Sequence, residues 1–177
     1  MPALFTPLPG APDGAADSLR ALLVTANGNG QSDVFLLGTG TYRLTVANPD
    51  NGATVNPQEN AGQTGDLDLT EANRTVVIQG QGSGKTVIDA AGLNDRVLHV
   101  LSNVRVELRD LTIRGGLALE QGTSGAPNGA ARGGGIFNSG GELTLDRVVV
   151  ENNEARGRPG TGSAAEGGAS TGPARFT

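Results

Sequence analysis

The sequence predicts an all-β fold of the solenoid type, a parallel β-helix of about three coils with a short capping helix near its N-terminus. Three observations predict it. Short β-prone segments recur after Asp66, two stretches repeat one apolar pattern, and the composition suits thin stacked layers. The 177 residues include 29 glycines, with 36% hydrophobic but only 3% aromatic residues. A core of this kind relies on Val, Leu and Ile, which fill the narrow layers of a solenoid.

The first 26 residues are expected to form an irregular arm and then a helix. Residues 1–14 are rich in Pro and Gly, which favour irregular structure. Over 17–26 the leucines recur at helical spacing, at positions 19, 22 and 23. Asp17 or Ser18 is placed to cap this helix, and the Asn-Gly-Asn-Gly run at 27–30 ends it. The helix precedes the first coil and is expected to cover its open end.

Short strands are predicted along the rest of the chain. Two are expected at 34–37 and 42–46, followed by a loop at 47–65. After Asp66 the strands come in three sets of three: 67–69, 76–79 and 86–88; 97–100, 104–108 and 111–113; and 136–137, 143–145 and 148–150. Alternation of apolar and polar residues, as in 104–108, predicts one buried and one polar face for each strand.

An internal repeat sets the expected stacking of the coils. VELRDLTIRGGLA at 106–118 aligns with LTLDRVVVENNEA at 143–155, and the apolar positions coincide while the polar ones vary. Stacked coils bury such positions together, with backbone hydrogen bonds at about 4.8 Å spacing. Residues 115–134 read as an insertion between coils. The cap and coils are therefore expected over 15–155, and the low-complexity tail at 156–177 is expected to be disordered and unable to pair with the last coil.

Composition also excludes several classes of function. The net charge is −5 and no basic run exists, so no nucleic-acid partner is expected. The absence of cysteine excludes disulfides and thiolate metal sites. No run of 18 apolar residues predicts a membrane span, and residues 1–10 lack the features of a signal peptide.

The chain resembles bacterial parallel β-helix surface proteins whose N-terminal region carries a CSLREA-type motif. The segments that carry the resemblance are DSLRALLVTAN at 17–27, TGTYRLTV at 39–46, GDLDLT at 65–70, VVIQGQGSGKTVIDAAGLNDRVLHV at 76–100, LTIRGG at 111–116, GGGIFN at 133–138 and LTLDRVVVENNEA at 143–155. Asp17 departs from the family's Cys, and Ala21 stands where Glu is usual. The family's later coils and anchoring region have no counterpart.

The resemblance implies a right-handed β-helix of the pectate-lyase-like superfamily that is secreted or displayed at the cell surface. The expected function is that of a non-catalytic, adhesin-like scaffold, with a surface polysaccharide or protein as its partner and end-to-end self-association at the open C-terminal end. Two alternatives stay open: a polysaccharide-binding or lyase-like module on the same fold, and an inert fragment of a longer adhesin.

Acidic and basic residues are the candidates for a functional site. Asp66, Asp68 and Glu71 either bind Ca²⁺ or, as we favour, lie on a solvated outer face. A lyase-like site needs carboxylates and an arginine to converge on one sheet. Asp89, Asp95, Asp110, Arg96 and Arg114 are the available residues, and their spacing does not force convergence. No catalytic, cofactor-binding or metal-binding residue is therefore assigned, and no enzyme activity is expected.

The other motifs favour structural roles. His99 alternates with Leu98 and Val100 and is expected to face outward, with no Ser or Asp pattern that makes it part of a catalytic triad. The glycine-rich stretch at 80–86 resembles a phosphate loop, but Gln79 stands where that motif needs Gly and β-prone residues follow it, which predicts a turn. Three asparagines are expected in turns and cross-coil hydrogen bonds rather than in sugar contacts: Asn138, Asn152 and Asn153.

Overall fold

The computed structural model describes residues 1–48, 59–119, 131–157 and 174–175, and its regular structure is almost entirely β. The single described helix, α1, spans Leu19–Ala26. The strands are β1 (Ala3–Phe5), β2 (Asp33–Leu36), β3 (Gly40–Arg43), β4 (Leu67–Leu69), β5 (Thr75–Gln79), β6 (Thr86–Asp89), β7 (Leu98–Val100), β8 (Arg105–Arg109), β9 (Thr112–Arg114), β10 (Leu117–Leu119), β11 (Ile136–Asn138), β12 (Glu142–Asp146), β13 (Val149–Glu151), β14 (Glu154–Arg156) and β15 (Ala174–Arg175). Every strand predicted after Asp66 is present, with bounds that differ by at most one residue.

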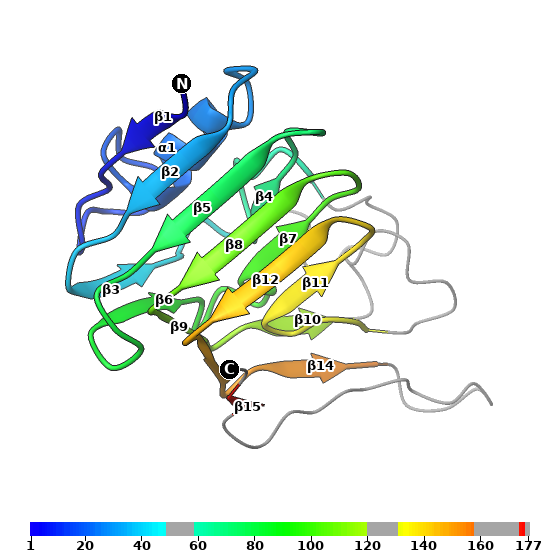
Figure 1. Ribbon diagram of the computed structural model, residues 1–177. Coiled ribbons are helices and arrows are strands. Elements are labelled where there is room, and N and C mark those ends of the chain that lie inside the picture. Colours follow the sequence, from blue (N-terminus) through cyan, green and yellow to red (C-terminus); the bar gives the residue numbers. More distant parts are fainter. Residues whose placement is uncertain (49–58, 120–130, 158–173, 176–177) are drawn as a thin grey trace.

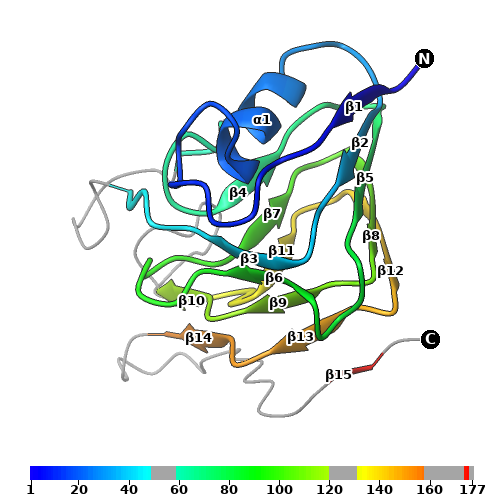
Figure 2. The ribbon, with the colours of Figure 1, turned by 90° about the vertical axis from the view of Figure 1, so that its left-hand side faces the viewer.

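The strands form separate parallel sheets (Figure 1). The first has the order β1-β2-β5-β8-β12, the second β15-β13-β9-β6-β3, the third β11-β7-β4, and β10 pairs with β14. All described pairs are parallel except β13–β15, which is antiparallel. The chain visits the first, second and third sheets in turn, so neighbours in a sheet come from successive passes. Figure 2 shows the three larger sheets surrounding a common interior.

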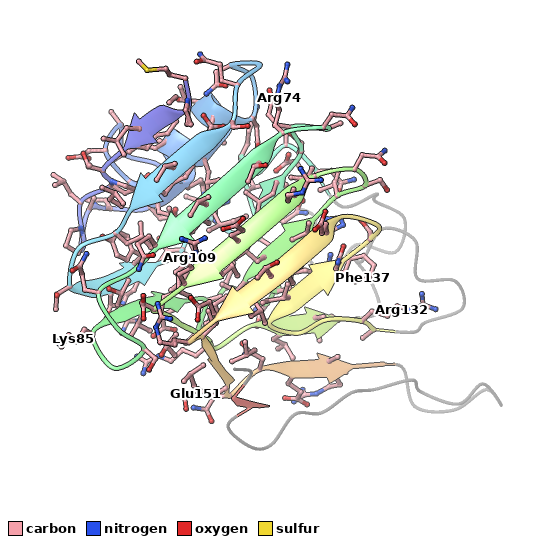
Figure 3. The ribbon with its side chains drawn as sticks, viewed as in Figure 1. Arg74, Lys85, Arg109, Arg132, Phe137 and Glu151 are labelled. Carbon is pink, nitrogen blue, oxygen red and sulfur yellow. The ribbon has the colours of Figure 1, made fainter. Side chains whose placement is uncertain are left out.

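The interior is aliphatic and is aligned from strand to strand. In the first sheet Val76 pairs with Val106, and Ile78 with Leu108; in the second, Ile88 pairs with Ile113. Each of these side chains is at most 1% exposed. Figure 3 shows the side chains that fill the space between the sheets, while charged residues such as Arg74 and Lys85 project from the turns. Aliphatic side chains of neighbouring strands thus pack on one another and fill the core without large aromatic side chains.

The predicted repeat is confirmed by the strand register. The alignment of 106–118 with 143–155 pairs five apolar positions, and the strand register contains four of them: Val106 with Leu143, Leu108 with Leu145, Ile113 with Val150, and Ala118 with Ala155. The fifth pair, Leu111 with Val148, lies just before the paired residues of β9 and β13. The apolar pattern therefore fixed the correct register, because a shift by one residue would have turned the aliphatic side chains out of the core.

The predicted helix is also confirmed, with Ser18 as its N-cap. The Ser18 hydroxyl accepts hydrogen bonds from the N–H groups of Ala21 and Gly14, both at 3.1 Å. Leu19 and Leu23 are buried, and the helix lies against β4 (Figure 2). It thereby adds an apolar layer to the N-terminal side of the described strands.

Three expectations about irregular segments are wrong in part. The arm at 1–14 contains β1, which pairs with β2, and Phe5 stacks on its register partner Phe35 at 4.8 Å between ring centroids. The insertion at 115–134 begins with β10, which pairs with β14. In the tail, β14 reaches Arg156, and β15 pairs with β13. Residues 49–58 of the predicted loop and 158–173 of the predicted tail lie outside the described residues.

Among the described residues, no helix is long and apolar enough to cross a bilayer.

Candidate functional site

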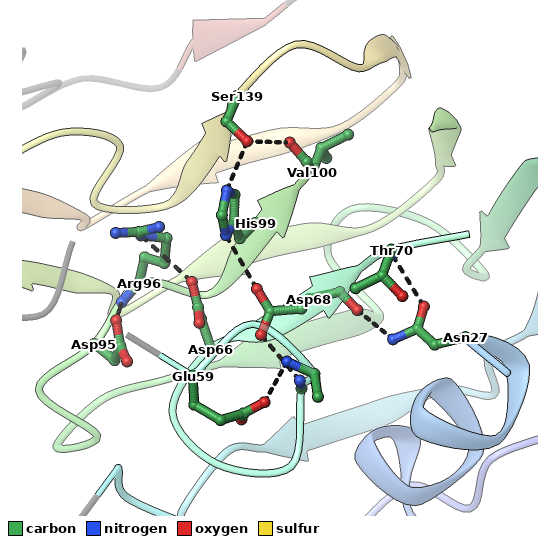
Figure 4. Close-up of polar contacts among 12 residues, drawn as sticks. Asn27, Glu59, Asp66, Asp68, Thr70, Asp95, Arg96, His99, Val100 and Ser139 are labelled. Carbon is green, nitrogen blue, oxygen red and sulfur yellow. Dashed lines mark hydrogen bonds and ion pairs between the residues drawn. The ribbon is translucent and has the colours of Figure 1, made fainter. Parts of the chain in front are cut away.

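A cluster of charged and polar side chains lies on the third sheet, on the face opposite the core. On β4, Leu67 and Leu69 point inward, so Asp68 points outward, as does Asp66 just before the strand. On β7, Leu98 and Val100 point inward and His99 points outward. The register places Asp68 directly beside His99. We call Asp66, Asp68, Asp95, Arg96 and His99 the polar cluster (Figure 4).

The polar cluster is buried, which contradicts the solvated outer face expected for Asp66 and Asp68. Asp66, Asp68 and Arg96 are 0% exposed and His99 is 3% exposed. The segment that precedes β4 covers this face: the Gly62 N–H donates to Asp68 Oδ2 at 2.9 Å. Alternation correctly predicts that these side chains point away from the core, but the covering segment is not encoded in that pattern.

Asp68, His99 and Ser139 form a continuous hydrogen-bonded line. His99 Nδ1 lies 3.0 Å from Asp68 Oδ1, and His99 Nε2 lies 2.8 Å from Ser139 Oγ. Ser139 follows β11 directly and is exposed. Its hydroxyl can also donate to the Val100 carbonyl oxygen, at 3.2 Å. The expectation that no Ser and Asp accompany His99 is therefore wrong, because parallel pairing brings together residues 31 and 40 positions apart.

Asp66, Asp95 and Arg96 form a second, deeper group. Arg96 Nε lies 3.4 Å from Asp66 Oδ2, and the guanidinium lies 4.8 Å from the centre of the Phe137 ring, within the range of a cation–π contact. The Arg96 N–H donates to Asp95 Oδ1 at 2.8 Å. No nitrogen of the guanidinium has a hydrogen-bond acceptor among the described residues. Carboxylates and Arg96 thus converge on one sheet, which the sequence spacing did not force.

Burial controls the ionisation of the cluster's carboxyl groups. Burial is the largest cause that raises the pKa of Asp66 well above its usual range, and the charges of Asp95 and Asp68 add to it. Burial also raises the pKa of Asp68, although the hydrogen bond to His99 acts to lower it. In the same way burial raises the pKa of Asp95, although the hydrogen bond from the Arg96 N–H acts to lower it.

Asp66, Asp68 and His99 also make up the group of side chains that could hold a metal ion, since one ligand atom from each lies within 4.8 Å of the others. Binding a metal there would break the hydrogen bond between Asp68 and His99. Glu71, the third member of the acidic set proposed from sequence, instead accepts a hydrogen bond from the Gly30 N–H at 3.3 Å.

The remaining candidate residues lie in other places. Arg114 donates two hydrogen bonds to Asp89 on the second sheet, and Arg147 donates to Asp110 at 2.6 and 2.7 Å. The Arg147 guanidinium lowers the pKa of Asp110 to about 2. The 80–86 stretch is the predicted turn, and strand β6 rather than a helix follows it. The predicted structural role of Asn153 is confirmed, because its side chain accepts from the Gly116 N–H and donates to the Ile113 carbonyl, 37 and 40 positions away in the sequence.

Two surface hollows accompany these residues. The larger, of about 620 Å³, lies between the N-terminal arm and β3, and its one acidic residue, Asp13, is already paired with Arg20. The smaller, of about 340 Å³, begins at Gly140, the residue after Ser139. Only the second hollow is lined by residues that follow directly on the hydrogen-bonded line of Asp68, His99 and Ser139. We therefore regard Ser139 and its surroundings as the candidate site.

The buried carboxyl groups predict a pH dependence of stability. Burial raises the pKa of Asp33, Asp66, Asp68 and Asp95. The folded chain therefore holds these protons more tightly than the unfolded chain, in which an Asp titrates near 3.9. Above about pH 4, raising the pH must lower the free energy of unfolding. The pKa values of Asp89 and Asp110 are lowered instead, and their contribution to the pH dependence lies below that range. Urea midpoints measured from pH 4 to 7 should fall, and the slope should shrink in Asp95→Asn; a midpoint that rises with pH would contradict this.

No family model, curated protein or solved structure matches the chain.

Proposed function

We propose that the chain is a right-handed parallel β-helix that serves as a scaffold in a secreted or cell-surface protein. The order in which it visits the three larger sheets supports a helical winding, as does the one-to-one pairing of strands from successive passes. The aliphatic interior and the helix against β4 fit a capped solenoid. The resemblance to CSLREA-type surface proteins supports export and display.

The observation that carries the scaffold proposal is the abrupt end of core burial at the last coil. Val106, Leu108 and Ile113 are 0% exposed. Their register partners Leu143, Leu145 and Val150 are only partly buried, although they pack against the same core. The last coil therefore presents the same aliphatic pattern as the coil before it, without a covering layer among the described residues.

Backbone groups at this end are also available for pairing. The Glu142 N–H donates to the Val104 carbonyl on the β8 side. Because successive N–H groups of a strand point to opposite sides, those of Leu143 and Leu145 face away from β8. No strand lies beyond β12 among the described residues, and β15 covers β13 only at Val149 and Val150. We propose that this end binds a further layer, and that in the isolated protein the layer is a second copy.

The alternative, a polysaccharide-binding or lyase-like module, has one observation in its favour. Asp66, Asp68, Asp95 and Arg96 converge on one sheet, as a lyase-like site requires. Their burial favours the scaffold, because a polymer cannot reach side chains that are at most 8% exposed. We expect no release of unsaturated uronide from pectate, with or without Ca²⁺, and its appearance above a blank would favour the lyase.

Sedimentation velocity over a range of concentrations tests the scaffold proposal. The wild-type protein should gain mass with concentration as uncovered ends meet. Leu145→Lys places a charge on the partly buried end and should suppress the association. Val77→Lys, on the outer face of the internal strand β5, is the matched control and should associate like the wild type. A protein that stays monomeric at the highest concentration would contradict the proposal.

A further inference from the structure

We propose that Ser139 is an activated nucleophile for acyl transfer, with His99 as its general base and Asp68 as the group that orients the base. The distances are those of a hydrogen-bonded relay, 2.8 Å from Ser139 Oγ to His99 Nε2 and 3.0 Å from His99 Nδ1 to Asp68 Oδ1 (Figure 4). A nucleophile in contact with a base that a third group orients is the arrangement that activates a serine hydroxyl, whatever fold carries it.

The burial of the three residues follows their proposed roles. The Asp68 side chain is 0% exposed and that of His99 is 4% exposed, whereas Ser139 is exposed. The hydroxyl that must meet a substrate is therefore reachable, while the relay behind it is shielded from water. His99 also packs on Phe137, with 5.0 Å between ring centroids, which fixes the plane of the imidazole.

The hydrogen bonds of Asp68 select the required tautomer of His99. Asp68 Oδ2 accepts the Gly62 N–H, which leaves Oδ1 to accept from His99 Nδ1. With its proton on Nδ1, the imidazole presents the lone pair of Nε2 to Ser139. The Ser139 hydroxyl hydrogen then has two acceptors in reach, Nε2 at 2.8 Å and the Val100 carbonyl at 3.2 Å, and the nearer one is the base.

The turn after β11 places two further donors beside the nucleophile. The N–H groups of Gly140 and Gly141 both point at one oxygen, Asn138 Oδ1, at 3.2 and 2.8 Å. Two adjacent N–H groups that converge on a single oxygen form the kind of donor pair that stabilises an oxyanion. Asn138 is exposed, so its side chain can rotate away and leave both donors to a substrate. Glycine is required at 141, because a Cβ there would lie 2.5 Å from Val100 Cγ1.

The adjoining hollow indicates the class of substrate. Its polar lining consists of Asn73, Arg74, Asn103, Arg105, Gly140, Gly141 and one acidic residue, Glu142, which is paired with Arg105. Amide and guanidinium groups bind oxygen-rich and anionic groups. A volume of about 340 Å³ suits a small molecule rather than a polymer. The geometry therefore points to a small, polar carboxylic ester.

The reaction is ordinary ester hydrolysis. Ser139 Oγ bonds to the carbonyl carbon as its proton passes to His99 Nε2. The bond from that carbon to the alcohol oxygen then breaks, and the alkoxide takes the proton from His99. Water attacks the acyl-serine next and gives its proton to His99, and the carboxylic acid leaves as Ser139 regains its hydrogen.

A fluorophosphonate probe tests the nucleophile without knowledge of the natural ester. The Ser139 oxygen displaces fluoride from phosphorus, and peptide mass spectrometry locates the adduct. We expect labelling at Ser139 in the wild type, no labelling in Ser139→Ala, and at least about 100-fold slower labelling in His99→Ala, the scale of a general base. Ser83→Ala removes a partly buried serine in the turn before β6, which has no contact with the relay, and should label like the wild type.

Two outcomes would overturn the proposal: no adduct at Ser139 in the folded wild type, or labelling of Ser139 at an unchanged rate in His99→Ala. Because His99 is buried, circular dichroism must show that each variant is folded. Asp68→Asn provides a second variant of the relay, whose labelling rate can be compared with that of the wild type. If His99→Ala is unfolded, the comparison of labelling between the wild type and Ser139→Ala still tests the nucleophile. Ser139 is exposed, so its replacement leaves the core intact. These outcomes do not depend on whether the chain self-associates.

Discussion

Replacing Ile113 by aspartate is expected to unfold the protein at neutral pH. Ile113 is 0% exposed and lies between Ile88 and Val150 in the second sheet. The substitution loses the burial of a large aliphatic side chain, about 2–5 kcal/mol, and buries a carboxyl group without a partner, which costs several kcal/mol more. The sum is comparable with the whole stability of a small domain, about 5–15 kcal/mol.

Val87→Asp is the matched control for this prediction. Val87 lies on the neighbouring strand β6 with its side chain on the opposite face, where it is only partly buried. Its replacement should change the free energy of unfolding by about 1 kcal/mol or less. Circular dichroism melts of the two variants decide the matter, and equal losses of stability would show that the inward and outward faces have been exchanged.

Replacing Arg20 by methionine is expected to destabilise the protein by about 3–5 kcal/mol, the cost of breaking a buried ion pair from one side. The Arg20 guanidinium bonds to Asp13 Oδ1 at 2.9 Å and donates to the carbonyl groups of Gly62, Gly65 and Asp66. The side chains of Arg20 and Asp13 are 2% and 1% exposed. Methionine keeps the volume but removes the donor of Asp13 Oδ1 and of the three carbonyl groups, while Asp13 Oδ2 still accepts from the N–H groups of Thr45 and Val46.

Arg74→Met separates this effect from a general loss of charge. Arg74 projects from the turn before β5 and is exposed (Figure 3). Its replacement should shift the urea midpoint by an amount equivalent to no more than about 0.5 kcal/mol. If Arg20→Met is as mild as Arg74→Met, then Arg20 does not hold the helix, the arm and the segment before β4 together.

Much of the fold follows from local sequence because strand alternation and register are local properties. The apolar pairs between 106–118 and 143–155 were predictable, since only one alignment places aliphatic side chains on aliphatic side chains. A cap at Asp17 or Ser18 followed from their position before the leucines, and the structure selects Ser18. The pairing of β1 with β2 did not follow, because it depends on a stacking contact between Phe5 and Phe35, 30 residues apart in sequence.

The candidate site was harder to predict because it depends on contacts between strands from successive passes of the chain. Alternation placed Asp68 and His99 on the outer faces of their strands, and both are the central residues of short strands in the same sheet. That shared position was the available signal that they are neighbours. Nothing local indicated that residues before β4 bury them, or that Ser139 ends the next strand within reach of His99.

Amide hydrogen exchange at four aligned positions of β8 and β12 tests most directly whether the outer edge of β12 is free of a further strand. By the alternation of the ladder, the N–H groups of Val106 and Leu108 point toward β12, and those of Leu143 and Leu145 point away from β8. In dilute protein, Val106 and Leu108 should be strongly protected, while Leu143 and Leu145 exchange rapidly and gain protection only as the concentration rises and copies meet end to end. Equal and concentration-independent protection at all four positions would contradict the proposed scaffold, because it would mean that another part of the same chain already covers β12.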